Sequence, residues 1–205
     1  DVCSSDLYFE HVHYYVVDEF WYAKEPGTQD VDIPVNKMSM DLKFFQAANI
    51  PEERIHTLRD ETVDSFDAAI QQTGGMDMVL MGIGTDGHFC GNHPGTFTNW
   101  NQGCHSIDRY CTPQVNQLLE FLLKDDIHSD DVSRIPDHYL TMGPKTIMDA
   151  KNIVMIFSGK GKAETVRRAF FGPVTMDFPV SVFQLHPHVS VLLDEAAASE
   201  IRELL

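Results

Sequence analysis

Residues 76–95 read MDMVLMGIGTDGHFCGNHPG, and this stretch decides the fold that we expect. It begins with the apolar run Met78 to Met81, which has the length of a fully buried β-strand. Glycines follow at positions 82, 84, 87, 91 and 95, with Asp86, His88 and His93 among them. Open α/β sheets place ligand sites in such loops, at the carboxyl ends of their strands. The stretch therefore predicts an α/β sheet with a site in the loop after this strand.

The residue types in the loop suit a site that handles protons. Glycine lets the backbone adopt positive φ and approach a ligand closely, which makes Gly84 and Gly87 candidate substrate-binding residues. Asp86 and His88 are two residues apart and can exchange a proton near neutral pH. The alternative is a strand followed by a loose loop with ordinary polar residues.

Composition limits the classes of partner. The chain has 205 residues and no run close to the roughly 18–20 apolar residues of a membrane span. Its net charge of −16 argues against nucleic acid but is compatible with a small anionic substrate met by local cations. The four cysteines form no CxxC pair, which favours reduced thiols. We therefore expect a cytoplasmic protein with no membrane or nucleic-acid partner.

Apolar periodicity predicts alternating strands and helices. We expect strands over residues 8–17, 78–81, 138–142, 152–157 and 189–193. We expect helices over residues 36–48, 62–73, 115–122, 144–150, after the turn at 158–162, and over 195–205, with a helical turn at 180–184. Residues 96–111 show no period and are expected to form a loop. Alternation of this kind predicts a mostly parallel sheet with helices on both faces, in a single domain over residues 1–205.

Two further segments carry candidate chemistry. Asp18 and Glu19 follow the first expected strand, and a carboxylate pair there is well placed for acid–base work; the alternative is a solvated strand end. The segment from Ser158 to Lys162 links a strand to a helix, whose free N–H groups attract anions. Lys160 or Lys162 would add full positive charge; the alternative is two solvated lysines in a turn.

Two other patterns are weak, and we expect neither a cofactor nor a metal. Residues 82–87 match GxGxxG, but the Gly, Asn and Pro residues that follow would break the helix that a dinucleotide site needs. His88, Cys90 and His93 have a spacing that matches no common closed zinc site.

Several motifs occur in an order that resembles one known family. They are residues 17–20 (VDEF), 81–95 (MGIGTDGHFCGNHPG), 139–143 (YLTMG), 147–150 (IMDA), 158–163 (SGKGKA) and 182–187 (VFQLHP). Together they resemble the glucosamine-6-phosphate deaminases/isomerases and the related 6-phosphogluconolactonases. The resemblance implies a three-layer Rossmann-like fold and a small phosphosugar as the binding partner.

The resemblance also implies roles for the candidate residues. In the deaminase branch, Asp18 would move a proton between C1 and C2 of the open-chain sugar. Asp86 and His88 would assist ring opening, and Lys162 would hold the substrate phosphate. In the lactonase branch, the Asp-Gly-His element would instead help water to attack a lactone. Asn92 matches the deaminase branch, and the resemblance makes it a further candidate substrate-binding residue.

The chain departs from the family pattern in two ways. His93 stands where the deaminases usually have Glu, which makes it a catalytic position of altered chemistry. The family's N-terminal strand, phosphate loop and helix are absent, which indicates an atypical, N-terminally truncated member. Three functions stay open: an amino-sugar-phosphate deaminase/isomerase, a phosphosugar lactone hydrolase, and a catalytically weak phosphosugar-binding protein. A homo-oligomer is also left open.

Overall fold

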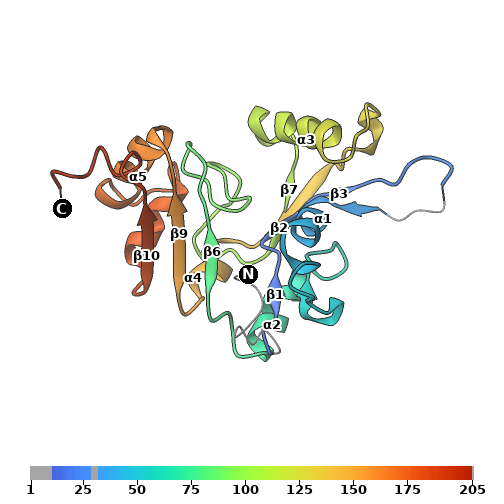
Figure 1. Ribbon diagram of the computed structural model, residues 1–205, viewed down its shortest axis with the longest axis horizontal. Helices are drawn as coiled ribbons and strands as arrows, with labels where there is room; N and C mark the ends of the chain where they lie inside the picture. The colour runs from blue at the N-terminus through green and yellow to red at the C-terminus, as the bar shows by residue number, and fades with distance from the viewer. Residues whose placement is uncertain (1–10, 29–31, 205) are drawn as a thin grey trace. The chain divides into compact units, whose positions relative to one another are not determined.

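The computed structural model describes residues 11–28 and 32–204 of the chain (Figure 1). The chain divides into two compact units: unit 1 comprises Asp1–Glu61 and Ser106–Leu140, and unit 2 comprises Thr62–His105 and Thr141–Leu205. The start of the strand expected over residues 8–17, and Cys3, lie outside the described residues. The expectation of a single domain stays a prediction.

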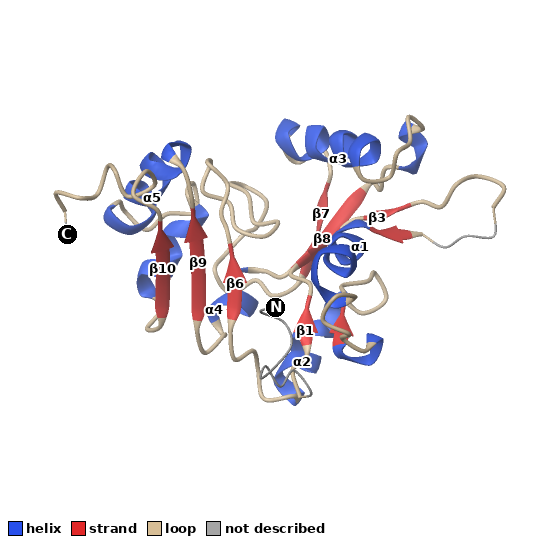
Figure 2. Ribbon diagram, in the orientation of Figure 1, coloured by secondary structure: helices blue, strands red, loops and turns tan. Residues whose placement is uncertain are grey.

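Unit 2 is built on a parallel sheet of three strands, as the alternating pattern predicted (Figure 2). The strands are β6 (Val79–Met81), β9 (Ile153–Phe157) and β10 (Val189–Leu193), in the order β10-β9-β6. In the register, Val79 and Val189 both pair with Ile153. Because all three strands run the same way, their carboxyl ends meet at one edge, where the loops at 82–95 and 158–162 begin.

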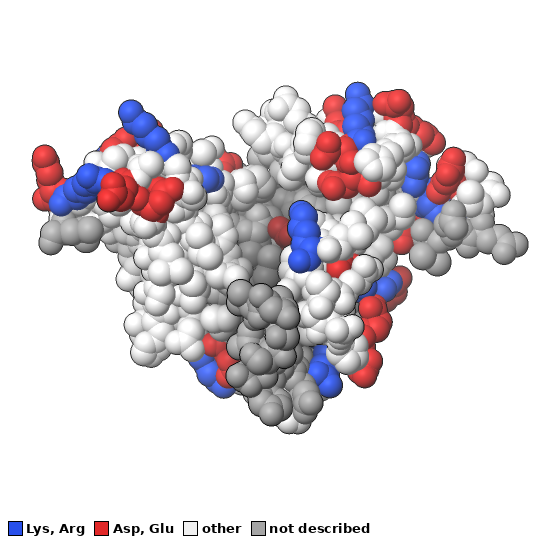
Figure 3. Space-filling view, viewed as in Figure 1, with Lys and Arg blue, Asp and Glu red and all other residues white. Residues whose placement is uncertain are grey.

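One face of this sheet is apolar and exposed. Leu80, Ile156 and Leu192 project from it with 59%, 49% and 54% of their surface exposed, whereas Val79 and Met81 on the other face are buried. Figure 3 shows no charged side chain over the middle of β9 and β10. The prediction that residues 78–81 form a fully buried strand is therefore wrong for one of its two faces.

The helices of unit 2 begin and end close to where periodicity placed them. They are α2 (Val63–Gln72), α4 (Pro144–Met148), the 3₁₀ turn η4 (Lys160–Lys162), α5 (Ala163–Phe171) and the 3₁₀ segment η5 (Pro179–Leu185). Val63, Phe66 and Ile70 of α2 are all buried, at the spacing of one helix face. Unit 2 is thus a mixed α/β structure.

Unit 1 contains short strands and one long helix. Its elements are β1 (Tyr14–Tyr15), β2 (Asp18–Glu19), β3 (Trp21–Tyr22), β4 (Ile33–Pro34), α1 (Val35–Met40), the π-helical turn η1 (Asp41–Phe45), η2 (Glu52–Arg54), β5 (Ile55–His56), β7 (His105–Asp108), α3 (Pro113–Asp125), η3 (Val132–Arg134) and β8 (His138–Thr141). β1 and β5 pair in parallel, β3 and β4 pair antiparallel, and the third sheet has the order β2-β8-β7.

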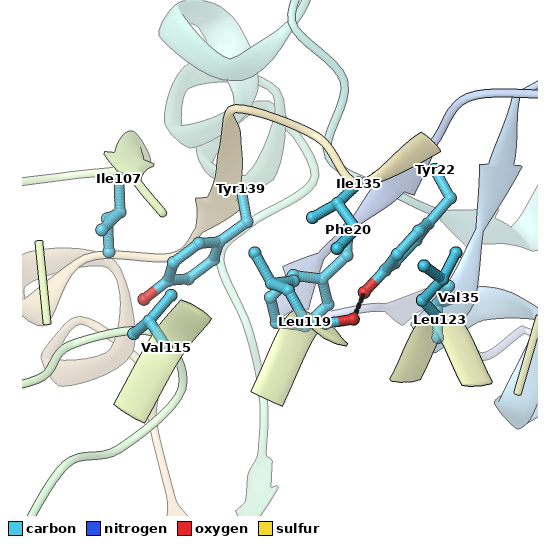
Figure 4. Packing of buried hydrophobic residues seen from close by; sticks show 9 residues of the cluster. All are labelled: Phe20, Tyr22, Val35, Ile107, Val115, Leu119, Leu123, Ile135 and Tyr139. Atoms are coloured by element: carbon cyan, nitrogen blue, oxygen red, sulfur yellow. Dashed lines mark hydrogen bonds between the residues drawn. The ribbon is translucent and has the colours of Figure 1, made fainter. Parts of the chain in front are cut away.

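The core of unit 1 lies where α3 covers this third sheet. Val115, Leu119 and Leu123 are buried along one face of α3 and pack against aromatic residues that include Tyr22 and Tyr139 (Figure 4). The buried Tyr22 hydroxyl donates a hydrogen bond of 2.7 Å to the Leu119 carbonyl oxygen. The core therefore fixes the short strands that carry Asp18 and Glu19.

Three expected elements differ from the structure. In the described part of the strand expected over residues 8–17, only Tyr14–Tyr15 form a strand. Residues 96–111, expected to be loop, contain strand β7, which is too short and polar to show a period. The helix expected over 195–205 is absent from its described part, because residues 195–204 form successive turns. Within the described residues, no helix has both the length and the apolar character that crossing a bilayer would require.

Candidate active site

The loop after β6 in unit 2 is a tight, glycine-dependent turn. The Gly84 N–H donates to the His88 carbonyl oxygen at 2.9 Å, and the Gly87 N–H donates to the Gly84 carbonyl oxygen at 3.1 Å. Gly87 has φ +82°, a conformation that other residues rarely adopt. A Cβ atom on Gly84 would lie 2.1 Å from Cε1 of His88. Both glycines are therefore needed to bring the His88 ring back over the turn.

Asp86 links two imidazole rings in this loop. Its Oδ1 lies 2.6 Å from His88 Nδ1, and its Oδ2 lies 3.3 Å from His93 Nδ1. The two ring centroids are 4.0 Å apart. The side chains of Asp86 and His88 are 43% and 31% exposed, whereas that of His93 is only 9% exposed. The structure thus brings together three of the four predicted catalytic residues.

The pKa values of Asp86 and His93 are both shifted in this cluster. Burial opposes ionisation of Asp86, but the charge of His88 and hydrogen bonds from both histidines outweigh it and lower the Asp86 pKa. Burial, together with the charge of His88, lowers the pKa of His93 despite Asp86. An ionised carboxylate can only accept, so the Nδ1–H of each ring donates to Asp86, and the Nε2 side of each ring is left for proton exchange. The cluster can therefore pass a proton through a fixed imidazole.

Buried contacts fix the loop to the last residue of β8, Thr141, and to Met142, which follows it. Asn92 is fully buried, and its Nδ2 donates to the carbonyl oxygens of Met142 at 2.8 Å and Phe89 at 3.2 Å. The Gly91 N–H donates to Thr141 Oγ1 at 2.9 Å. Asn92 therefore positions the loop, and its predicted contact with substrate stays a prediction.

The second loop of unit 2 presents one lysine to the first. Lys162 Nζ donates to the Ile83 carbonyl oxygen, whereas Lys160 is exposed. The turn before them already contains a carboxylate: Asp194 Oδ2 accepts from Ser158 Oγ at 2.7 Å and from the Gly159 N–H at 2.8 Å. The Gly159 N–H is thus not free for an anion. Of the residues predicted to bind the substrate phosphate, Lys162 is therefore the one that lies beside the Gly-rich loop.

The predicted base, Asp18, belongs to unit 1. Its Oδ1 accepts from Asn36 Nδ2 at 2.7 Å. The neighbouring Glu19 is fully buried and accepts from three backbone N–H groups, those of Phe20, Asn36 and Lys37, at 3.0, 2.7 and 2.9 Å. Sequence reasoning missed Asn36, for which a polar residue at the start of an expected helix was the only signal.

Both carboxyl groups hold protons more tightly than usual. Burial raises the pKa of Asp18 to about 6, although the Asn36 side chain opposes the shift. Burial also raises the pKa of Glu19 to about 7, with Asp18 adding to it and the three N–H donors opposing it. A carboxylate with a pKa near 6 suits a general base near neutral pH. That Asp18 acts on the same substrate as the unit 2 cluster stays a prediction.

The chain is similar to several glucosamine-6-phosphate deaminases. It is 34% identical to that of Arthrobacter sp. (strain FB24), with 97% of this chain and 73% of the relative covered. It is 38% identical to that of Rhodococcus jostii (strain RHA1), with 78% of this chain and 60% of the relative covered. For the Rhodococcus opacus (strain B4) protein the identity is 43%, and the chain spans only 49% of that relative's length.

Solved structures give the same family and a wider fold group. A structure described as a monomeric glucosamine-6-phosphate deaminase has a TM-score of 0.71 and 28% identity, covering 92% of this chain and 74% of its own. A 6-phosphogluconolactonase from Trypanosoma cruzi has a TM-score of 0.61 and 16% identity over 94% of this chain and 74% of its own, which shows a shared fold alone. No protein-family model matches the chain. On the Arthrobacter match, the chain belongs to the glucosamine-6-phosphate deaminase family.

Proposed function

We propose that the chain carries an amino-sugar-phosphate deaminase/isomerase activity, with glucosamine 6-phosphate as its substrate. The observation that carries this proposal is the hydrogen-bonded cluster of Asp86, His88 and His93 in a member of the deaminase family. A carboxylate that orients an imidazole is the arrangement a proton shuttle needs. The relatives' names support the substrate.

The proposed reaction divides proton handling between two groups of residues. Asp86 orients His88, which passes a proton to the ring oxygen so that the sugar ring opens. Asp18, as carboxylate, then takes the proton from C2 and delivers it to C1. One proton of the amine passes to O1, so that C1 becomes a CH2OH group and the nitrogen is left on C2 as an imine, which water cleaves to ketose phosphate and ammonia. Water is consumed in that step, which is the sense in which we class the enzyme as a hydrolase.

Substrate binding in this proposal depends on the two loops of unit 2. Lys162 holds the phosphate, and Lys160 adds positive charge nearby. The backbone of Gly84 and Gly87 approaches the sugar, while Asn92 keeps the loop in place. The turn geometry of the glycines supports this assignment, because it leaves no room for larger side chains at position 84.

The proposal includes the wider setting expected from the sequence. The chain would form one domain with a three-layer Rossmann-like arrangement and act in the cytoplasm on a small phosphosugar. Coverage of 92% of the chain by the deaminase structure supports the fold.

His93 favours a second candidate function. A neutral imidazole cannot supply the fixed negative charge of the glutamate that deaminases usually have here. Lactone hydrolysis needs no proton transfer at C2, and structural neighbours include 6-phosphogluconolactonases. A phosphosugar-binding protein with weak catalysis is the remaining reading.

Turnover of two substrates distinguishes these functions. Ammonia release from glucosamine 6-phosphate and loss of 6-phosphogluconolactone would be measured for the wild type, Asp18→Asn and Asp60→Asn. Asp60 is the matched control, because it is an exposed carboxylate that pairs with His138 elsewhere in unit 1. We expect Asp18→Asn to lower ammonia release about 100-fold or more, and Asp60→Asn to leave it unchanged.

Other outcomes of this two-substrate assay would favour one of the alternative functions. Hydrolysis of the lactone alone would replace the deaminase assignment with a lactonase. Binding of the amino-sugar phosphate without turnover of either substrate would leave a binding protein. Restoring the usual residue with His93→Glu should raise deaminase turnover, and no change would count against that assignment.

A further inference from the structure

We propose that Asp86, His88 and His93 together form a binding site for one divalent transition-metal ion, such as Zn²⁺. Sequence spacing argued against a metal because it grouped His88 and His93 with Cys90. The structure instead groups the two imidazoles with a carboxylate that comes from the same turn. The site itself does not depend on sugar chemistry; only its effect on turnover rests on the proposed function.

The geometry is close to what an ion requires. Each residue offers one ligand atom, and the three atoms lie within 4.8 Å of one another. Metal–nitrogen and metal–oxygen bonds of about 2.0–2.2 Å place neighbouring ligand atoms roughly 3–3.5 Å apart. The His93 Nδ1 to Asp86 Oδ2 distance of 3.3 Å already falls there, and the 2.6 Å contact of His88 need only lengthen. An ion would thus replace two hydrogen bonds with bonds to the same three groups.

The donor chemistry points to a transition metal with an open position. Two imidazoles and one carboxylate are the protein ligands of several catalytic zinc and iron sites, which leave a further position for water or substrate. His93 is nearly enclosed, whereas the Asp86 side chain is 43% exposed, so an ion could enter from solvent. A ring that binds the ion through Nδ1 carries its proton on Nε2.

The surroundings keep this arrangement in place without a ligand. The loop is anchored by the buried hydrogen bonds of Gly91 and Asn92 to the end of β8 and the residue that follows it. Gly84 leaves the space that the His88 ring occupies. Preorganised ligands of this kind bind an ion at lower entropic cost.

Occupancy would also change the proposed reaction. An ion bound to Asp86 and His88 takes away the pair that assists ring opening. We therefore expect Zn²⁺ to inhibit ammonia release, and a chelator to restore it.

Binding can be tested without any sugar, by titrating the untagged chain with Co²⁺ and following its visible absorption. We expect one Co²⁺ per chain. His93→Gln and Asp86→Asn should each weaken binding at least tenfold, because changes even outside the ligand set cost about 10–100-fold. Competition by Zn²⁺ should abolish the Co²⁺ spectrum.

Matched controls come from two other hydrogen-bonded pairs that contain histidine, one with an aspartate and one with a second histidine. His138 bonds to Asp60 at 2.7 Å, and His13 bonds to His56 at 2.8 Å, so each resembles part of the cluster. His138→Ala and His56→Ala should leave the Co²⁺ affinity unchanged. Circular dichroism without metal would confirm folding; should His93→Gln fail to fold, the more exposed Asp86→Asn decides the test.

Two results would overturn the metal site. One is an affinity that neither cluster variant changes, and the other is a loss that the control variants share equally. A chain that binds Co²⁺ as expected but releases no ammonia would refute the proposed function and leave the metal site standing.

Discussion

Replacing Glu19 with glutamine tests whether burial or hydrogen bonding determines the pKa of this carboxyl group. Glu19 lies in β2 and accepts from N–H groups at the start of α1. Burial raises the Glu19 pKa to about 7, although three backbone N–H groups donate to the side chain. Between the unfolded and folded pKa values, the folded state then binds more protons than the unfolded state. The free energy of unfolding must therefore fall as the pH rises from 4.5 through about 7.

The size of the effect follows from the shift. A change from 4.5 to about 7 is worth about 3 kcal/mol, since each pKa unit corresponds to about 1.4 kcal/mol. Most of this, about 2–3 kcal/mol, develops between about pH 5 and pH 8. Glutamine does not titrate, so Glu19→Gln should remove this dependence. The glutamine NH2 group that takes the place of Oε2 cannot accept from the Lys37 N–H, which adds a loss that does not vary with pH.

Urea unfolding at several pH values measures the difference. Trp21 lies in unit 1, where its Nε1 donates to the Leu58 carbonyl oxygen at 2.8 Å. A Trp100→Phe background would make Trp21 fluorescence the only tryptophan signal of unfolding. We expect the wild type to lose about 2–3 kcal/mol relative to Glu19→Gln from about pH 5 to pH 8.

The opposite trend would refute this reasoning. A wild type that gains stability over the variant as the pH rises would mean that the three N–H donors outweigh burial. Glu19 would then be an ionised cap of α1 with a lowered pKa, as carboxylates with several N–H donors can be. A difference that does not vary with pH would equally reject the predicted shift.

Three kinetic predictions concern the proposed reaction. Gly84→Ala would place Cβ 2.1 Å from the His88 ring; we expect kcat for ammonia release to fall about 100-fold at nearly constant KM, and an unchanged kcat would contradict the turn's role. Lys162→Met should raise KM for glucosamine 6-phosphate about tenfold or more with unchanged circular dichroism, because a charged hydrogen bond is lost; an equal KM would place the phosphate elsewhere. Ammonia release should rise with pH through about 6, since burial gives Asp18 that pKa and only its carboxylate is a base; a flat pH–rate profile would exclude this role.

The sequence predicted those elements whose apolar residues repeat over several turns or along a whole strand. α2 and α3 each bury three residues on one face, β9 is a continuous apolar run, and β10 is apolar except for Ser190. β7 was missed because four residues with one buried side chain carry no usable period. The expected C-terminal helix was wrong because short helices depend on packing, and here buried Ala197 and Ile201 are placed by turns.

Site residues that come from one short loop could be predicted, whereas contacts between distant segments could not. Asp86, His88 and His93 could be found because one short loop supplies all three. Asp194 lies 35 residues from Gly159, from whose N–H it accepts a hydrogen bond. The local sequence around residues 158–162 therefore could not predict that a carboxylate lies in the expected anion site. The contact of Asn36 with Asp18 depends likewise on how the chain folds back on itself.

The exposed row of Leu80, Ile156 and Leu192 favours self-association of the chain in solution, by an amount that can be estimated. Fully burying such a side chain is worth about 1.5–3 kcal/mol, and roughly half of each is still exposed, so covering all three yields about 2–5 kcal/mol. Bringing two molecules together costs about 4–15 kcal/mol of lost motion. In a symmetric pair each molecule contributes its own row, so contact between two rows yields about 4–10 kcal/mol, which lies within the range of that cost. The rows alone therefore give at most a weak association, and a stable dimer would have to bury a wider area.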